Sequence, residues 1–260
     1  SITDANGNTT TYKFDANRNQ ISKINALGHT TESKFNQKQN QITFIDPEGN
    51  TTTNTYNLQN LIDNIIDAEG NTLSFTYDGV GNKLSETDYN GNSTSYVYDA
   101  INQLISSTDP LGFITSFTYD ANGNKISSTD ANGNIIHYAF DALGRNVQIT
   151  DALGNTSTIS YDNNSNITTE TDKLGNLNSF NYDDLNRLIQ RTDALGSSTN
   201  YTYDGNGNKL SITNPLGHIL TYVFDALNRM ITETNAEGET HSYTYDAINN
   251  LTSTTFPSGN

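Results

Sequence analysis

One stretch in the middle of the chain contains a complete structural unit. It reads Phe117-Thr118-Tyr119-Asp120-Ala121-Asn122-Gly123-Asn124-Lys125-Ile126-Ser127-Ser128-Thr129-Asp130-Ala131-Asn132-Gly133. Phe117 and Tyr119 are two residues apart, so on a β-strand their side chains lie on the same face. Asp120 to Gly123 is typical of a turn, because Asp accepts hydrogen bonds from nearby amides and Asn and Gly tolerate positive φ. A short second strand, Lys125 to Thr129, leads into a second turn of the same kind, so the stretch predicts strand, turn, strand, turn.

The same register repeats along the whole chain with a period of 21 residues and no insertion or deletion. The glycines of the second turn are Gly7, Gly28, Gly49, Gly70, Gly91, Gly112, Gly133, Gly154, Gly175, Gly196, Gly217, Gly238 and Gly259. Seven residues after each of the first twelve comes an aromatic residue: Phe14, Phe35, Tyr56, Tyr77, Tyr98, Tyr119, Phe140, Tyr161, Tyr182, Tyr203, Phe224 and Tyr245. The residue after it is Asp in ten of the twelve copies, and a second aromatic stands two residues before it in nine. Repetition this regular indicates a repeat architecture.

Each repeat predicts two antiparallel strands, because its apolar residues are spaced by two and turn residues recur about every ten. In one copy, Tyr96 and Tyr98 face one side, whereas Ser95 and Val97 face the other. Twelve repeats then form about 24 strands, and a sheet of that size twists and curls. The expected fold is all-β: an antiparallel meander of two-strand repeats wound into a spiral or barrel-like shell, with the aromatic columns as its core.

The second strand of the repeat carries an apolar residue in the column of Ile105, with three exceptions. There a non-apolar residue follows an apolar one: Asp63 after Ile62, Thr168 after Ile167, and Thr252 after Leu251. A β-bulge or small register slip is therefore expected in these three repeats.

Composition excludes several classes of protein. A net charge of −16 and a pI near 4.3 argue against binding of nucleic acid or of an anionic membrane. No run of apolar residues is long enough for a transmembrane helix. Cysteine is absent, which excludes disulfides and thiol chemistry. We therefore expect no nucleic acid and no membrane insertion among the partners.

The repeats leave no internal boundary, so residues 1–260 are expected to form one array of 12 repeats. The chain begins just before one second-turn column and stops inside another, at Thr255-Phe256-Pro257-Ser258-Gly259. Beginning and stopping in the same phase predicts an excerpt of a longer array.

The repeat resembles the YD-repeat (Rhs-repeat) family over the whole chain. The pattern is Gly, five residues, aromatic-x-aromatic-Asp-x-x-Gly-Asn, an aliphatic residue, then Thr-Asp before the next Gly, and it is almost complete from Gly112 to Asp130. That family includes bacterial polymorphic toxins, the cocoon component of insecticidal toxin complexes, cell-wall-associated proteins and the animal teneurins. The resemblance implies a continuous sheet wound as a hollow shell that encloses a toxin or forms an extracellular scaffold.

Family toxin shells end in a self-cleaving aspartyl site, Pro-x4-Asp-Pro-x-Gly-Leu. The nearest match here is Asp109-Pro110-Leu111-Gly112-Phe113, with Leu104 at the position of the upstream Pro and Phe113 in place of Leu. Similar turns recur as Asp46-Pro47-Glu48-Gly49 and Asn214-Pro215-Leu216-Gly217, so all three are interpreted as ordinary turns with Pro at the second position. The self-cleaving activity of the family toxin shells is therefore not expected in this chain.

No residues stand out as catalytic, cofactor-binding or metal-binding. His29, His137, His218 and His241 lack motif partners, and His29 and His218 occupy the same column just after a turn glycine. Calcium is the main cofactor alternative, because Asp4-Ala5-Asn6-Gly7-Asn8 and Asp130-Ala131-Asn132-Gly133-Asn134 offer oxygen ligands at alternate residues. Gly at the fourth position and the lack of a Glu at the twelfth favour turn-stabilising hydrogen bonds instead.

Carbohydrate binding by the Tyr-rich columns is a further alternative, although aromatic residues at a period of two usually form a core. Asn-x-Ser/Thr sequences occur at Asn8, Asn50, Asn92, Asn155, Asn163, Asn166, Asn200 and Asn250, and matter only if the source glycosylates its proteins.

The sequence therefore predicts a non-enzymatic structural β-spiral of a secreted or cell-surface protein, acting as an encapsulating shell or scaffold. The alternative is a self-assembling extracellular fibre, adhesin or glycan-binding module. Expected partners are neighbouring repeats, further copies bound end to end, an encapsulated polypeptide or a surface glycan.

Overall fold

Every regular element of the described chain is a β-strand. The structure is a computed structural model that describes residues 1–257, and those residues form 25 strands and no helix. Gly259, the last glycine of the repeat, lies outside the described residues. The chain divides into two compact units, Ser1–Asn134 and Ile135–Asn260.

The strands alternate between a six-residue and a five-residue type. Those of the first unit are β1 (Ile2–Thr3), β2 (Thr9–Phe14), β3 (Gln20–Ile24), β4 (Thr30–Phe35), β5 (Gln41–Ile45), β6 (Thr51–Tyr56), β7 (Ile62–Ile66), β8 (Thr72–Tyr77), β9 (Lys83–Thr87), β10 (Ser93–Tyr98), β11 (Leu104–Thr108), β12 (Ile114–Tyr119) and β13 (Lys125–Thr129). Those of the second unit are β14 (Ile135–Phe140), β15 (Asn146–Thr150), β16 (Thr156–Tyr161), β17 (Ile167–Thr171), β18 (Leu177–Tyr182), β19 (Leu188–Thr192), β20 (Ser198–Tyr203), β21 (Lys209–Thr213), β22 (Ile219–Phe224), β23 (Met230–Thr234), β24 (Thr240–Tyr245) and β25 (Leu251–Thr255).

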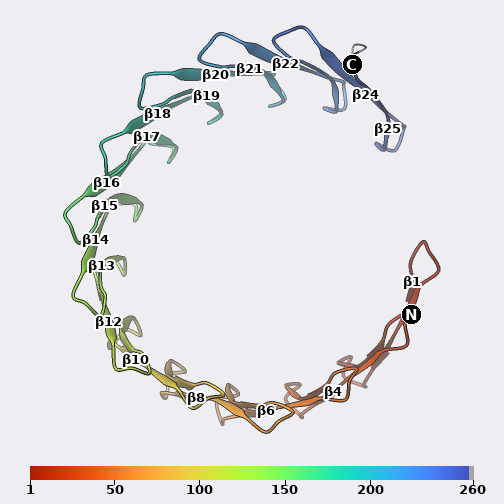
Figure 1. Ribbon diagram of the computed structural model, residues 1–260, viewed down its shortest axis with the longest axis vertical. Helices are drawn as coiled ribbons and strands as arrows, with labels where there is room; N and C mark the ends of the chain where they lie inside the picture. The colour runs from red at the N-terminus through yellow and green to blue at the C-terminus, as the bar shows by residue number, and fades with distance from the viewer. Residues whose placement is uncertain (258–260) are drawn as a thin grey trace. The chain divides into compact units, whose positions relative to one another are not determined.

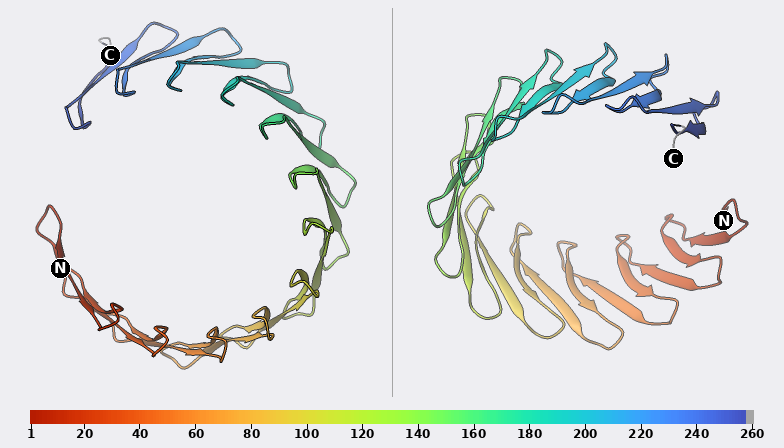
Figure 2. Two further views of the ribbon diagram at one scale, coloured as in Figure 1. Left: turned by 180° about the vertical axis from the view of Figure 1, so that it is seen from behind. Right: turned by 45° about the horizontal axis from the view of Figure 1, so that its top comes forward.

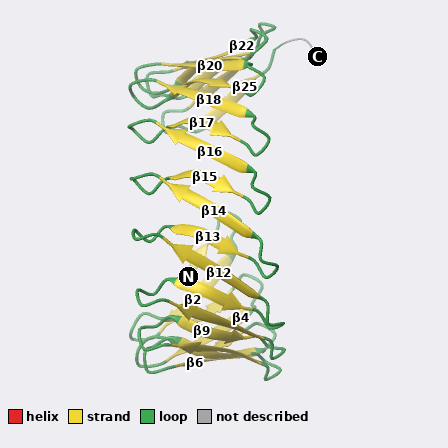
Figure 3. Cartoon of the chain, turned by 90° about the vertical axis from the view of Figure 1, so that its left-hand side faces the viewer, coloured by secondary structure: helices red, strands yellow, loops and turns green. Residues whose placement is uncertain are grey.

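Each unit is an antiparallel meander, in which every strand pairs with the strands before and after it in the sequence. The pairs run from β1–β2 to β12–β13 in the first unit. They run from β14–β15 to β24–β25 in the second unit. Within each unit the strands follow one another along a curved ribbon, with turns at both edges (Figures 1, 2 and 3). The predicted all-β meander of two-strand repeats is confirmed.

The turns at both edges have one geometry. In the turn Asp109–Phe113, the amide of Gly112 donates to the carbonyl of Asp109 at 3.0 Å, and the amide of Asp109 donates to the carbonyl of Phe113 at 2.9 Å. The fourth residue adopts positive φ, 85° at Gly112, where Gly carries no steric penalty. In the other turn of the repeat that position accepts non-glycine residues, most often Asn, as at Asn102 with φ of 67°.

Every complete two-strand repeat in the described chain contains a β-bulge, which corrects the expectation of bulges in three repeats. Tyr98 pairs with Leu104 but Val97 pairs with Ser106, so that Ile105 has no partner of its own. The same shift occurs in all twelve hairpins. The repeats with Asp63, Thr168 and Thr252 therefore pair like the others.

Polar residues are tolerated at the bulge because their side chains form hydrogen bonds with hydroxyl groups on the face of the sheet opposite the aromatic columns. Asp63 accepts a hydrogen bond from the hydroxyl of Thr55, and the hydroxyls of Thr252 and Thr244 lie 2.9 Å apart. We call this side the hydroxyl face; Ser95, Val97 and Ser106 also lie on it. The opposite side, with Tyr96 and Tyr98, is the aromatic face.

The aromatic face is half-buried, and the buried aromatic core expected from the sequence is not found. Along β10 exposed and half-buried residues alternate, with Tyr96 and Tyr98 half-buried and Val97 50% exposed. No apolar side chain of residues 1–257 is fully buried. A sheet of a single layer covers its aromatic rings only with side chains of neighbouring strands, so the rings retain contact with solvent.

Candidate functional site

The polar groups of the turns bond to one another within each repeat. In the turn that opens with Asp120, the carboxylate Oδ1 accepts the amides of Asn122 and Asn124, both at 2.9 Å. The other carboxylate oxygen, Oδ2, accepts the side-chain amide of Asn124 at 2.9 Å. A short polar side chain thereby satisfies the backbone groups that a tight turn leaves unpaired.

These hydrogen bonds favour the ionised form of the carboxylates. The side-chain amide of Asn124, followed by its backbone amide, lowers the pKa of Asp120 below its ordinary value. At Asp151 the ammonium of Lys173, 3.0 Å from Oδ2, is the largest cause and lowers the pKa to about 2. The carboxylates of the two segments considered for calcium, Asp4 and Asp130, bond to amides of their own turns in the same way. Residues 1–257 contain no cluster of three or more His, Asp or Glu residues arranged to hold a metal ion.

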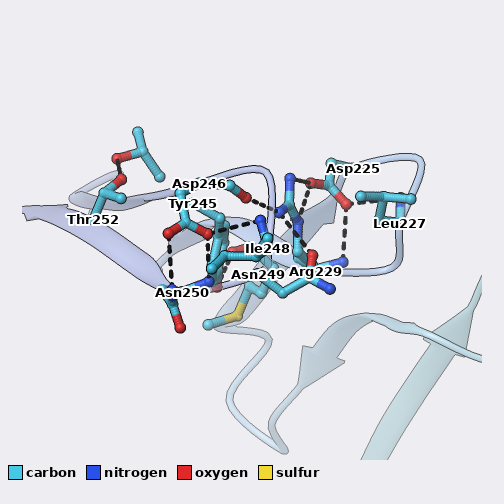
Figure 4. Close-up of polar contacts among 11 residues, drawn as sticks. Asp225, Leu227, Arg229, Tyr245, Asp246, Ile248, Asn249, Asn250 and Thr252 are labelled. Carbon is cyan, nitrogen blue, oxygen red and sulfur yellow. Dashed lines mark hydrogen bonds and ion pairs between the residues drawn. The ribbon is translucent and has the colours of Figure 1, made fainter.

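Three arginines join successive repeats in the second unit. Arg145, Arg187 and Arg229 occupy the last position of a turn in every second repeat. Arg229 donates through Nε to Oδ2 of Asp225 at 2.7 Å and through Nη1 to the carbonyl oxygen of Asp246 in the next repeat at 3.0 Å (Figure 4). Its guanidinium carbon lies 4.8 Å from the centre of the Tyr245 ring. The arginine thus combines an ion pair, a hydrogen bond and a cation–π contact across two repeats.

Asparagines connect the repeats that lie between the arginines. Nδ2 of Asn166 donates to Oδ1 of Asn186, 20 residues later, at 2.8 Å, and Asn208 bonds to Asn228 in the same way at 2.9 Å. Arginine and asparagine therefore alternate along one edge of the second unit. Every one of these contacts links a turn to the equivalent turn of the next repeat.

Replacement of Arg187 by Asn is expected to weaken this linkage. Asn stands at the same position in other repeats and preserves the bond to the turn Asp, but it cannot reach the carbonyl of Asp204 or the ring of Tyr203, which Arg187 contacts at 2.7 and 4.8 Å. We expect a loss of about 1–2 kcal/mol in the free energy of unfolding, measured by urea denaturation. Arg18→Asn, at a turn position with positive φ, is the control and should cause no loss. Equal stability of both variants and the parent chain would contradict a stabilising role for the arginine contacts.

Tyrosine hydroxyls bond to the backbone next to the bulge. Tyr119 donates to the carbonyl oxygen of Leu104 at 2.7 Å, 15 residues earlier. The same bond is made by Tyr56, Tyr77, Tyr161, Tyr203 and Tyr245 to Gln41, Ile62, Asn146, Leu188 and Met230. The acceptor is the first residue of the bulged strand in the preceding repeat. Desolvation raises the pKa of Tyr119, with the charge of Asp99 as a second cause.

Lysines at the start of three bulged strands lie over rings of the aromatic face. The ammonium of Lys83 is 5.0 Å from the centre of the Tyr96 ring and 2.5 Å from a carboxylate oxygen of Glu86. Lys125 lies 5.3 Å from the ring of Phe117, and Lys209 lies 5.1 Å from that of Tyr201. The aromatic face of this chain therefore accommodates primary ammonium groups at several places.

The four histidines lie in different local settings. His29 and His218 follow turn glycines, and each donates its backbone amide to the Asn that opens its turn. His137 lies in β14 opposite Thr150. His241 lies in β24, with its ring centre 5.3 Å from that of Phe256 in an edge-on arrangement.

The segment Asp109–Phe113 has the backbone geometry of the other turns. Its carboxylate Oδ1 accepts the amides of Leu111 and Phe113, each at 2.9 Å. Most of the Asn-x-Ser/Thr asparagines also belong to turns, and their side-chain amides donate to the Asp that opens the turn: Asn8, Asn50, Asn92, Asn155, Asn166 and Asn250. No helix that could cross a membrane occurs in residues 1–257.

The curved sheet and its repeated turn define the class of protein: a structural β-repeat protein. The family described as RHS Repeat matches the chain seven times, at residues 77–113, 98–135, 119–156, 140–177, 182–219, 207–240 and 224–260. These matches cover residues 77–177 and 182–260. The chain therefore belongs to the Rhs-repeat family.

Two solved structures share the fold. One is the crystal structure of TcdB2-TccC3-TEV, with a TM-score of 0.65, 17% identity and 95% of this chain covered. The other is the Tc holotoxin pore of Photorhabdus luminescens, with a TM-score of 0.66, 16% identity and 96% of this chain covered. The present chain spans 16% of each of those chains. A search of curated proteins gave no match.

Proposed function

We propose that the chain is a non-enzymatic structural segment of a larger secreted or cell-surface protein, in which it forms part of a scaffold that encloses or presents another polypeptide. One observation carries the proposal: side-chain hydrogen bonds of a few kinds recur at equivalent positions along the chain and link successive repeats. Tyr119 to Leu104 and Arg187 to Asp204 are examples of such links. A scaffold that encloses a polypeptide needs such links between successive repeats along its length.

Membership of the Rhs-repeat family and the similarity to TccC3-containing structures support the scaffold role and an extracellular location. The family resemblance implies shells around toxin polypeptides and extracellular scaffolds. The non-enzymatic part of the proposal is supported by the use of the carboxylates: Asp120 and its equivalents accept turn amides through both oxygens. We also propose that residues 1–260 are one uninterrupted part of a longer array.

Limited proteolysis of the parent protein tests the proposal. The cleavage of the polypeptide encoded next to the array by a protease is measured as temperature rises. The β-sheet signal of the array is measured over the same range by circular dichroism. If the array encloses that polypeptide, its resistance to cleavage and the β-sheet signal should be lost over the same temperature range. The variant Arg187→Asn should shift both to lower temperature together. Digestion of the neighbouring polypeptide at temperatures well below the unfolding temperature of the array would contradict enclosure.

A self-assembling fibre or adhesin is the second candidate. Within the described residues, successive hairpins pair in one repeated register, as β22–β23 and β24–β25 do, so a further copy in the same register can continue the pairing. Head-to-tail addition of this kind produces open filaments. In the same samples, particles that lengthen with concentration in sedimentation, together with free digestion of the neighbouring polypeptide, would favour the fibre over the enclosing scaffold.

A further inference from the structure

The turns contain a dipeptide, Asn-Gly, that is prone to a spontaneous reaction. The backbone nitrogen of Gly can attack Cγ of the preceding Asn, because Gly has no side chain to obstruct the approach. Two of these dipeptides occupy the same position in the turn that follows the aromatic column, and they can be compared directly: Asn122-Gly123 and Asn206-Gly207. The other three lie in the second turn of the repeat: Asn6-Gly7, Asn90-Gly91 and Asn132-Gly133.

The backbone restrains the two comparable sites to the same extent. The amide of Gly123 donates to the carbonyl of Asp120 at 3.1 Å, and the amide of Gly207 donates to the carbonyl of Asp204 at 3.2 Å. Both glycines adopt positive φ, 89° and 92° respectively. Both asparagines are exposed. The reacting nitrogen therefore has closely similar surroundings at the two sites.

The side-chain amides of the two asparagines differ. Nδ2 of Asn206 donates to Oδ1 of Asn228 in the next repeat at 3.0 Å. The same oxygen accepts Nδ2 of Asn208 at 2.9 Å, so that Asn228 holds two side chains of the preceding turn. Within residues 1–257, the side chain of Asn122 makes no hydrogen bond, and its backbone amide alone is bound by the turn. The same holds for the three asparagines of the other turn, Asn6, Asn90 and Asn132.

This difference affects the rate of attack. Cγ can meet the nitrogen of the following Gly only if the side-chain amide rotates away from its position in the folded turn. At Asn206 the rotation breaks the hydrogen bond to Asn228, whereas at Asn122 it breaks none. A hydrogen bond of ordinary net strength changes a rate by about fivefold. Asn206 should therefore react more slowly than Asn122.

We propose that Asn122 and the other asparagines with free side chains are sites of spontaneous deamidation in the folded protein, and that Asn228 protects Asn206. The nitrogen of Gly123 loses its proton to hydroxide and forms a bond to Cγ of Asn122. The bond from Cγ to Nδ2 breaks, and the nitrogen leaves as ammonia. Water then opens the resulting succinimide at either carbonyl, which leaves an aspartate or an isoaspartate in place of Asn122.

Both products disturb the turn. Each adds a negative charge beside Asp120, whose Oδ1 accepts the amides of Asn122 and Asn124 at 2.9 Å. The isoaspartate also inserts a methylene group into the backbone, which displaces the amide of Asn124 from that carboxylate. We therefore expect modified turns to open locally, and their number to rise with the age of the protein. This holds whether the array encloses a polypeptide or forms a fibre.

The test incubates the whole chain at mildly alkaline pH, below its unfolding temperature, and measures deamidation at each site by digestion and mass spectrometry. The rates at Asn122 and Asn206 are compared in the folded chain and in urea. The urea measurement corrects for the different preceding residues, Ala121 and Gly205. The ratio of the two rates should be about fivefold larger in the folded chain than in urea. Equal ratios under the two conditions would overturn the proposal.

Asn228→Gly removes the protecting side chain. The variant gives the turn Asp225–Arg229 the sequence that Asp141–Arg145 already has, so the turn should be preserved. Deamidation at Asn206 should become about fivefold faster, while Asn122 in the same molecule keeps its rate. An unchanged rate at Asn206, or equal acceleration at both sites, would overturn the proposal.

A second pair of variants places a new Asn-Gly dipeptide under the same protection. Nδ2 of Asn164 donates to Oδ1 of Asn186 at 2.9 Å, and Ser165, at positive φ, follows Asn164. Ser165→Gly should create a dipeptide that resists deamidation as Asn206 does. Addition of Asn186→Gly should accelerate the reaction at Asn164 about fivefold and leave Asn206 unchanged. Fast deamidation of Asn164 in Ser165→Gly alone would overturn the proposal.

Discussion

Lowering the pH from neutral to about 2 is expected to lower the free energy of unfolding of the chain. The turn carboxylates have a lower pKa in the folded than in the unfolded state, because folded turns supply amide and guanidinium donors that the unfolded chain lacks. The residues concerned are Asp4, Asp15, Asp46, Asp67, Asp78, Asp88, Asp120, Asp130, Asp141, Asp151, Asp162, Asp172, Asp183, Asp204, Asp225 and Asp246.

The sign follows from proton binding. A group with a depressed folded pKa binds fewer protons in the folded state, so its stabilising effect is complete above the unfolded value of 3.8 and is lost as pH falls through the folded value. For Asp151, whose folded pKa is about 2, the loss extends to that pH. Each contribution is small because the carboxylates are at the surface, but the same contribution recurs along the array.

Urea denaturation at a series of pH values from 7 to about 2 measures the effect as a falling midpoint. A variant with several turn Asp residues changed to Asn is the control, because Asn36 already accepts the amides of Lys38 and Asn40 in such a turn. This variant should lose less stability in acid than the parent chain. A midpoint independent of pH would show that the turn hydrogen bonds do not distinguish folded from unfolded carboxylates.

Tyr119→Ala is expected to lower the free energy of unfolding by about 2–3 kcal/mol. The sequence alone suggests about 3–5 kcal/mol, the usual cost of truncating a buried aromatic residue. The structure reduces that figure because the ring is half-buried, and it adds the lost hydrogen bond from the hydroxyl to the carbonyl of Leu104. Urea denaturation of the variant measures the loss.

Tyr119→Phe separates the ring from the hydroxyl. The sequence predicts a small effect, because Phe replaces Tyr in this column four times. Because Tyr119→Phe removes the hydrogen bond to Leu104, we expect the free energy of unfolding to fall by about 1 kcal/mol. Phe35→Ala, in the same column, has no hydroxyl to lose and serves as the comparison. If Tyr119→Ala were silent, the ring would contribute nothing to stability, and a role in stacking against a ligand would become the better explanation.

Strand positions and turns could be predicted because both are local. The strand expected from Asn92 to Tyr98 is observed from Ser93 to Tyr98, and the exposed Val97 alternates with half-buried tyrosines as the period of two requires. The turn after Tyr98 has positive φ at Asn102, as its residues indicate. Side-chain chemistry at a turn is decided within five residues, which a single repeat already contains.

Features that depend on two repeats were harder to predict. No residue type indicates that the carbonyl of Leu104 accepts the Tyr119 hydroxyl, since the acceptor is a backbone group that every residue has. The arginines did leave a signal: Arg145, Arg187 and Arg229 are 42 residues apart, twice the repeat. The bulge was hidden because apolar Ile105 fits a regular strand and a bulge equally well, so only the polar replacements at Asp63, Thr168 and Thr252 drew attention to it.

The bulge at Ile105 resolves a problem of parity. Paired residues share a face, and both turns of the repeat join paired residues an even number of positions apart, as in Tyr98 with Leu104 and Thr108 with Ile114. With such turns, equivalent residues an even number of positions apart would share a face of a meander without bulges, whereas an odd separation would place them on opposite faces. With 21 residues per repeat, Tyr98 and Tyr119 share a face only because one residue of each hairpin is left out of the pairing. An odd repeat thus requires an odd number of unpaired residues. Substitution of Ile105 leaves this count unchanged, as Asp63 shows, whereas its deletion would turn every later repeat inside out.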